Sequence, residues 1–115
     1  MRCPIVRNTF NRVLGSLIND YRIAVVLPAF NASQTLAQTY SEIPQEIVDE
    51  IILVDDASTD DTAEIAKQIG ITHIIKHKTN RGYGGNQKSC YQYGLDLGVD
   101  IIVMLHPDYQ YTPRL

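Results

Sequence analysis

Three carboxylates in this chain of 115 residues follow apolar segments, where a folded domain can use them to bind a cation or a nucleotide. Asp55 and Asp56 end the segment IILV, and Asp108 comes shortly after the segment IIVML. Grouped carboxylates are good ligands for a hard divalent cation that also contacts phosphates. Asp55 has an alternative role as a hydrogen-bond acceptor for a nucleobase or a ribose. Asp56 has the structural alternative of closing the turn, together with Ser58, and capping the next helix.

His106 precedes Asp108 by two positions. Residues at i and i+2 of an extended segment point to the same side, so both side chains can face one cation. A neutral imidazole is a suitable ligand for manganese or a similar ion. A hydrogen bond to a phosphate and a purely structural bond to the backbone are the alternatives for His106. His73 and His77 lie in or beside another apolar segment and are expected to be structural.

The segment NRGYGGNQKS at 80–89 combines glycines with basic residues. It offers backbone amides and the side chains of Arg81 and Lys88 to an anion at the start of a helix. Gly82 and Lys88 fit the phosphate-binding loop pattern GxxxxGK[ST], but Gln87 stands at its second glycine, which the loop conformation requires. The dinucleotide pattern GxGxxG fails at the same position. The segment therefore predicts an anion site, although both motifs match only weakly.

Short apolar segments alternate with helical patterns from residue 22 onward, as is typical of parallel sheets with both faces covered. The predicted strands are 23–27, 51–54, 71–75 and 101–105. The first strand is expected to end at Pro28. The spacing of Leu36, Tyr40 and Ile43 indicates a helix between the first two strands.

Two further helices are predicted. Ser58 or Thr59 is expected to cap the second helix, which ends at Gly70. Its buried stripe consists of Ala63, Ile65, Ala66 and Ile69. A glycine-rich loop is expected at 79–86, and the third helix follows it, with Cys90 facing the core. That helix carries Cys90, Tyr91, Gly94, Leu95 and Leu97.

This alternation predicts the α/β class, with an open, mostly parallel sheet and helices on both faces. Ligands of such sheets bind beyond the carboxyl ends of the strands. Polar or conformationally special residues follow all four predicted strands, at 28–31, 55–56, 80–86 and 106–110. No covering helix follows the last predicted strand, so we expect a partner or further chain to complete the sheet.

Composition excludes several classes of protein. Hydrophobic residues make up 44% of the chain and charged residues 20%, which fits one globular domain. A net charge of −3 argues against a generally basic nucleic-acid binder. Cys3 and Cys90 are too few for a disulfide scaffold, and no apolar segment reaches the roughly 18 residues that span a bilayer. We therefore expect a cytoplasmic domain at 22–115 behind a loosely ordered leader at 1–21.

Four segments together resemble the N-terminal half of a family 2 glycosyltransferase with the GT-A fold. They are VVLPAFNAS (25–33), ILVDDASTDDT (52–62), NRGYGGNQKS (80–89) and MLHPDYQY (104–111). Each match is weak alone, but their order and spacing are specific. The nearest members are similar to dolichol-phosphate mannosyltransferase and polyprenyl-phosphate glycosyltransferases, and the resemblance covers residues 22–115. It implies a Rossmann-like half that binds a nucleotide sugar.

The resemblance also implies roles for individual residues. It assigns nucleotide-sugar binding to Pro28, Phe30, Asn31, Asp55, Asp56, Arg81, Gly82, Lys88 and Gln110. Residues 106–108 match the family's DxD motif, so Asp108 and His106 are the implied ligands of a divalent cation, Mn²⁺ or Mg²⁺. Two positions depart from the family pattern. His106 replaces the first aspartate of the motif, and Ala32 replaces a glutamate that usually ends the first segment.

Members of this family invert the anomeric carbon by direct displacement, with a cation that neutralises the leaving diphosphate and a carboxylate that takes the acceptor's proton. That base lies in the C-terminal half of the family, so the resemblance implies no catalytic base here and an inactive isolated chain. The implied partners are a nucleotide-diphosphate sugar, a polyprenyl or dolichyl phosphate acceptor at a membrane surface, and a second copy or a complementing C-terminal portion. The alternatives are a non-catalytic nucleotide-binding or association fragment and a P-loop nucleotide hydrolase that uses Lys88.

Overall fold

The computed structural model of the chain describes residues 21–107. The predicted leader, apart from residue 21, and the site candidates Asp108 and Gln110 lie outside the described residues. The elements are, in order, β1 (Ile23–Ala29), α2 (Leu36–Ser41), β2 (Glu50–Asp55), α3 (Thr62–Gln68), β3 (His73–Lys76), α4 (Gly82–Asp96) and β4 (Ile101–Met104). Within residues 21–107, no helix has the length and apolar character needed to cross a membrane.

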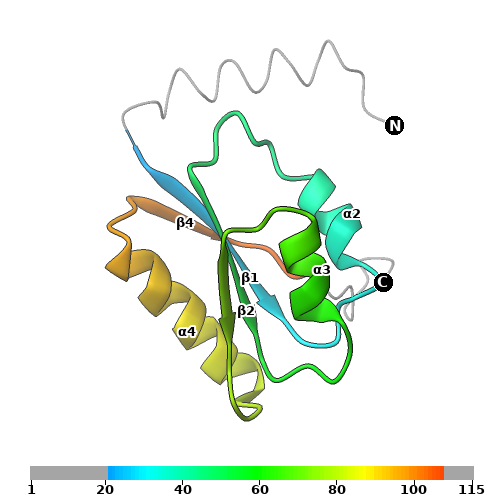
Figure 1. The fold of residues 1–115 in the computed structure, drawn as a ribbon. Coiled ribbons are helices and arrows are strands. Elements are labelled where there is room, and N and C mark those ends of the chain that lie inside the picture. Colours follow the sequence, from blue (N-terminus) through cyan, green and yellow to red (C-terminus); the bar gives the residue numbers. More distant parts are fainter. Residues whose placement is uncertain (1–20, 108–115) are drawn as a thin grey trace, which may run out of the picture.

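The four strands lie parallel in one sheet with the order β3-β2-β1-β4. The central strand β1 pairs Val26 with Ile52 of β2 on one side and with Met104 of β4 on the other. The predicted α/β class with an open parallel sheet is therefore confirmed. Because the strands are parallel, their carboxyl ends and the loops that follow them meet at one edge of the sheet (Figure 1).

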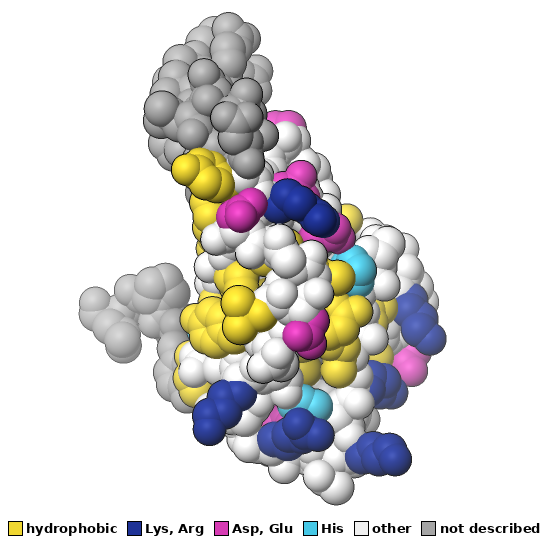
Figure 2. Space-filling view, turned by 90° about the vertical axis from the view of Figure 1, so that its left-hand side faces the viewer, with side chains coloured by type: hydrophobic (Ala, Val, Ile, Leu, Met, Phe, Trp, Pro, Cys, Tyr) yellow, Lys and Arg dark blue, Asp and Glu magenta, His cyan; other side chains and the backbone are white. Residues whose placement is uncertain are grey.

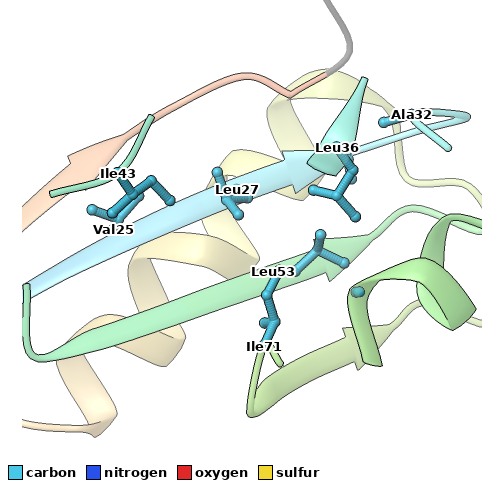
Figure 3. Packing of buried hydrophobic residues seen from close by; sticks show 9 residues of the cluster. Val25, Leu27, Ala32, Leu36, Ile43, Leu53 and Ile71 are labelled. Carbon is cyan, nitrogen blue, oxygen red and sulfur yellow. The ribbon is translucent and has the colours of Figure 1, made fainter. Parts of the chain in front are cut away.

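Helices cover both faces of the sheet, with α2 and α3 on one face and α4 on the other (Figure 1). Side chains alternate along β1, as the period of a strand requires. Val25 and Leu27 pack with α2 and α3, whereas Ala24 and Val26 pack with α4. Figure 3 shows the first of these clusters, in which Leu36 of α2 lies close to Leu27.

The helix α4 packs closely on the sheet. Cys90 is fully buried, and burial raises the pKa of its thiol to about 12, so the predicted core position of this cysteine is confirmed. A Cβ atom on Gly94 would lie 2.8 Å from Cδ1 of Ile102, so the glycine permits the close approach of α4 to β4. Tyr91 and Leu95 lie on the other side of the helix and are 45% and 63% exposed.

The glycine-rich segment differs most from the prediction. The sequence predicts a loop over 79–86, but α4 already begins at Gly82. The reason lies in a distant loop, because the carboxylate of Asp56 accepts hydrogen bonds from the amides of Arg81 and Gly82 at 2.7 and 3.0 Å. This cap, supplied from outside the segment, compensates for the low helix propensity of its glycines.

The strand boundaries also differ from the prediction, most clearly for β1 and β3. Pro28 does not end β1, which continues to Ala29 and stays paired with β2 up to that residue. The third strand occupies His73–Lys76 instead of 71–75. Ile71 is part of the core between sheet and helices, and its amide donates to the end of α3, so it serves the helix terminus and not the strand.

Candidate functional site

The loops after β1 and β2, residues 30–35 and 55–62, are hydrogen-bonded to each other at the carboxyl edge of the sheet; we call them the joined loops. Asn31 Oδ1 accepts a hydrogen bond from the amide of Thr59 at 2.9 Å, and the amide of Asn31 donates to Oγ of Ser58 at 2.9 Å. Asn31 has a φ of 52°, in the left-handed region that asparagine tolerates better than most residues. Ala57 has a φ of 60° without that tolerance. The two loops therefore hold each other in a partly strained shape.

These bonds also change the predicted cap of α3. The residue before the helix is Asp61, which makes no side-chain cap bond, and the helix begins at Thr62. Ser58 and Thr59 are not caps, because their polar groups bond to Asp55 and to the β1 loop. The hydroxyl residues of this segment therefore serve the joined loops and not the helix.

Asp60 makes a second connection between the joined loops. Its carboxylate accepts hydrogen bonds from the amide and hydroxyl of Thr62 and from the amide of Ser33. Burial alone would raise the pKa of Asp60, but the hydrogen bonds from Thr62 and Ser33 together lower this pKa below its ordinary value of 3.8. Above the pKa that Asp60 has in the unfolded chain, its ionised carboxylate therefore contributes fully to the stability of the fold. This contribution is lost as the pH falls through the lower pKa that Asp60 has in the folded state.

Asp55 ends β2, where the second of the joined loops begins, and is only 1% exposed. Its Oδ1 accepts hydrogen bonds from the amide of Ser58 at 3.0 Å and from the Ser58 hydroxyl. Pro28 is buried near the end of β1, and Phe30 follows that strand with its side chain half-buried. The fold thus brings Pro28, Phe30, Asn31 and Asp55 to the same part of the carboxyl edge.

Asp56 has a different environment from its neighbour, because protein donors surround its carboxylate. Besides the two amides at the start of α4, Nδ1 of His77 lies 2.7 Å from Asp56 Oδ1, and Asp56 is 2% exposed. His77 Nε2 lies 2.8 Å from Oγ of Ser89, so the three side chains form a buried chain. His77 is structural, as predicted. The hydrogen bonds to Asp56 occupy the amides of Arg81 and Gly82, which a phosphate-binding loop would present to its ligand. This counts against the P-loop alternative.

The basic residues of the glycine-rich segment lie beside the joined loops, not among them. Arg81 and Lys88 line an open groove of about 870 Å³ that α4 forms with β3 and the residues after it. None of the residues that line this groove comes from the joined loops. Gly82 is exposed at the first position of α4. The fold therefore gathers Arg81, Gly82 and Lys88 in a second group, separate from Asn31 and Asp55.

Asn86 is a buried residue of the site that the sequence interpretation missed. Its Nδ2 donates to the carbonyl oxygen of Val54 at 3.1 Å and to that of Ala29 at 3.4 Å, and Cys90 Sγ lies 3.7 Å from its Oδ1. Asn86 thus ties α4 to the ends of β1 and β2. The helical spacing of four residues from Cys90 could have indicated this, because it puts Asn86 on the core-facing side of α4.

His106, after β4, contacts the first turn of α4. Its ring stacks on that of Tyr83 with a centroid distance of 5.3 Å and an interplanar angle of 22°. His106 Nε2 also lies 3.1 Å from the Tyr83 hydroxyl. The predicted second ligand, Asp108, lies outside the described residues. Within residues 21–107, no group of three or more His, Cys, Asp or Glu side chains could hold a metal ion.

Comparison with known proteins places this geometry in a family. The model of glycosyl transferase family 2 matches residues 24–115. The chain belongs to glycosyl transferase family 2. The resemblance predicted from the four sequence segments is thereby confirmed.

Among the family 2 relatives is an uncharacterized protein of Methanocaldococcus jannaschii, 36% identical over 97 residues, which cover 84% of this chain and 40% of the relative. Another is a UDP-N-acetylglucosamine–dolichyl-phosphate N-acetylglucosaminyltransferase of Methanococcus voltae. It is 28% identical over 110 residues, covering 82% of this chain and 44% of that protein. The family 2 chain described here thus spans about two fifths of the length of these relatives.

Solved structures give the same assignment. The crystal structure of glucosyl-3-phosphoglycerate synthase from Mycobacterium tuberculosis matches with a TM-score of 0.69 and 27% identity, covering 83% of this chain and 37% of that one. The same enzyme in complex with Mn²⁺, UDP and glucosyl-3-phosphoglycerate matches with a TM-score of 0.68 and 26% identity, covering 82% of this chain and 36% of that one. The family 2 chain therefore has the predicted GT-A type of α/β fold.

Proposed function

We propose that this chain is the nucleotide-sugar-binding part of a glycosyltransferase that transfers a sugar from a nucleoside diphosphate to a polyprenyl or dolichyl phosphate. The observation that carries the proposal is the pair of joined loops at the carboxyl ends of β1 and β2, where open α/β sheets bind their ligands. The UDP complex of a structural neighbour and the dolichyl-phosphate acceptor named for the Methanococcus voltae relative support it.

The nucleoside is assigned to the joined loops. Phe30 offers a half-buried aromatic face to a base, while the carboxylate of Asp55 accepts hydrogen bonds from a base or a ribose. Pro28 and Asn31 fix the backbone on which these side chains stand. Asp56 contributes indirectly, because its carboxylate supports the start of α4.

The diphosphate is assigned to the start of α4, beside the joined loops, where the basic residues lie. Arg81 and Lys88 are exposed cations near the start of α4 whose side chains can contact a phosphate, and Gly82 leaves room beside them because it has no side chain. Gln110 completes this proposed set as a hydrogen-bonding residue.

A divalent cation, Mn²⁺ or Mg²⁺, is assigned to His106 and Asp108. An imidazole and a carboxylate form a donor set that suits Mn²⁺, and His106 is held at the carboxyl edge by Tyr83. When bound, such a cation supplies positive charge against the departing diphosphate. The Mn²⁺ and Mg²⁺ complexes of the mycobacterial enzyme support this assignment.

The chain itself is proposed to bind the donor without transferring the sugar. No residue of the proposed set is a base placed for the acceptor, so we assign that base and the acceptor site to the region of the relatives beyond the matched part. A complementing portion or a second copy would supply it. The proposed setting is the cytoplasmic surface of a membrane, where a lipid-linked phosphate is accessible.

Calorimetric titration of the chain with UDP and with GDP, in Mn²⁺ and in chelator, tests the proposal. We expect saturable binding that requires Mn²⁺ and weakens at least about tenfold in Asp108→Ala, which removes a charged ligand. Asp61→Ala is the control, since Asp61 makes no side-chain cap bond. A folded chain that binds neither nucleotide would contradict an assembled donor site. ATP binding that disappears in Lys88→Ala would favour the P-loop alternative.

A further inference from the structure

The groove between α4 and β3 gathers more positive charge than the proposed donor site accounts for, since that site includes Arg81 and Lys88 but neither Lys76 nor Lys78. Four basic side chains line it, and we call it the basic groove: Lys76, Lys78, Arg81 and Lys88. Ile75 and Tyr93 give it an apolar part. The lower half of the face drawn in Figure 2 carries most of the basic side chains in view, whereas most of the acidic ones lie above it. Basic side chains therefore gather on this part of the surface, with a few acidic ones among them.

The cations of the basic groove have no carboxylate partners among residues 21–107. The ion pairs described there join Arg22 and His73 to Glu50, and His77 to Asp56. The acidic residue that lines the groove, Asp96, accepts a hydrogen bond from Gln92 instead. Four of the six Lys and Arg residues of the described part thus line one groove of a chain with a net charge of −3. Such a concentration of unpaired charge indicates an anionic partner.

The geometry favours an extended anionic surface over a single bound phosphate. A site for one phosphate presents backbone amides or buried donors, but the amides of Arg81 and Gly82 already bond to Asp56. All four cations are exposed and come from different places along the groove: the end of β3, the loop that follows it, and α4. Long exposed side chains of this kind attract an array of charges through their summed field.

We propose that the basic groove docks the chain on a lipid bilayer rich in anionic headgroups. The polar headgroup layer of such a membrane attracts basic clusters near its surface, and Lys and Arg stems keep their charges at that level while their carbons cover apolar side chains such as Tyr93. This inference rests on the proposed function, because a lipid-linked acceptor would require the donor site to work at a membrane. The groove then holds the carboxyl edge of the sheet near the lipid phosphates.

Cosedimentation of the 115-residue chain with vesicles tests this docking. One set of vesicles contains phosphatidylcholine alone, and the other contains phosphatidylcholine mixed with phosphatidylglycerol. We expect binding to the second set only, weaker at higher salt because the charges are exposed. Lys78→Gln should weaken it roughly fivefold and Lys76→Gln/Lys78→Gln roughly 30-fold. Lys67→Gln is the matched control, since it removes one exposed charge from α3 on the opposite face of the sheet.

Several results would overturn the proposal. These are an absence of binding to phosphatidylglycerol vesicles, equal weakening by Lys67→Gln and Lys78→Gln, or binding that the double variant retains. Displacement by inorganic phosphate at low millimolar concentration would assign the groove to a soluble phosphate compound instead. UDP titration of Lys76→Gln/Lys78→Gln separates this inference from the proposed function, because neither lysine belongs to the proposed donor site and the Kd for UDP should not change.

Discussion

The two halves of the carboxyl edge are built differently. At β1 and β2, the joined loops are cross-linked by side chains that bond to the backbone of the opposite loop, and two residues take positive φ values. At β4, His106 is held by one stacked ring and one hydrogen bond, both from Tyr83, which is 56% exposed. One half is fixed by several hydrogen bonds between its loops. In the other, the hydroxyl of Thr35 donates to the carbonyl oxygen of Pro107, and the side chain of His106 is held by the exposed Tyr83.

This difference indicates how the two halves take part in binding. A site that is already held in shape loses little conformational entropy when a ligand arrives. The joined loops fit that description and suit the recognition of a nucleoside. Fewer contacts hold the β4 half in place. A bound cation with its diphosphate would add further contacts there. Variants that weaken the restraints of each half should therefore have unequal effects on stability.

Asp56→Ala should have the largest effect, since Asp56 connects the β2 loop to α4. The change leaves the buried His77 and the amide of Arg81 without their acceptor, while the amide of Gly82 keeps only its bond to Oδ1 of Asn80. We expect the free energy of unfolding to fall by about 3 to 5 kcal/mol, because each buried donor left without an acceptor costs about 1 to 3 kcal/mol. Urea denaturation followed by circular dichroism measures it.

Asp61→Ala is the control for that measurement. It removes a neighbouring carboxylate that is exposed and makes no side-chain cap bond, so the change should stay within about 0.5 kcal/mol. Equal losses in the two variants would mean that the acidic segment acts through its overall charge and not through the cap on α4.

The sequence was sufficient for the order of strands and helices but not for these connections. The apolar segments around Val26 and Ile52 have the length and β-branching of buried parallel strands, so these two properties identified them directly. The start of α4 at Gly82 was not predicted, because the local acceptor Asn80 is joined there by Asp56, which lies more than twenty positions away in the chain. Local propensity contains no information on such a tertiary bond.

The candidate site, too, could be predicted from the sequence only in part. Asp55 and Asn31 were identified as site residues because they follow strands in a recognisable pattern, and the fold does bring their loops together. Asn86 was missed because its role depends on the carbonyl oxygens of two strands that meet only in the folded sheet. The separation of Arg81 and Lys88 from the joined loops also depends on packing, since it follows from the position of α4 against the sheet.

Asn31→Ala should lower the free energy of unfolding by an intermediate amount, because it removes a bond between the joined loops. The variant loses the bond to the amide of Thr59 and forces alanine into a φ of 52°. We expect a loss of about 1 to 2 kcal/mol in unfolding free energy and weaker UDP binding. Asn31→Gly keeps the backbone conformation and removes only the side chain, so urea denaturation should give it a smaller loss. Equal losses would show that the conformation at Asn31 is not strained.

Tyr83→Phe should have the smallest effect on stability, because it changes only an exposed contact of the β4 half. The ring stack on His106 is kept and only the hydroxyl that lies 3.1 Å from Nε2 is lost, so unfolding should change by less than about 0.5 kcal/mol. In titrations with Mn²⁺ and UDP, however, the apparent affinity for Mn²⁺ should fall by up to about tenfold, since a group that orients a proposed ligand is gone. Tyr91→Phe, on the exposed side of the same helix, should change neither quantity. A stability loss in Tyr83→Phe as large as that of Asn31→Ala would mean that β4 is restrained as strongly as the joined loops, and the contrast between the two halves would then fail.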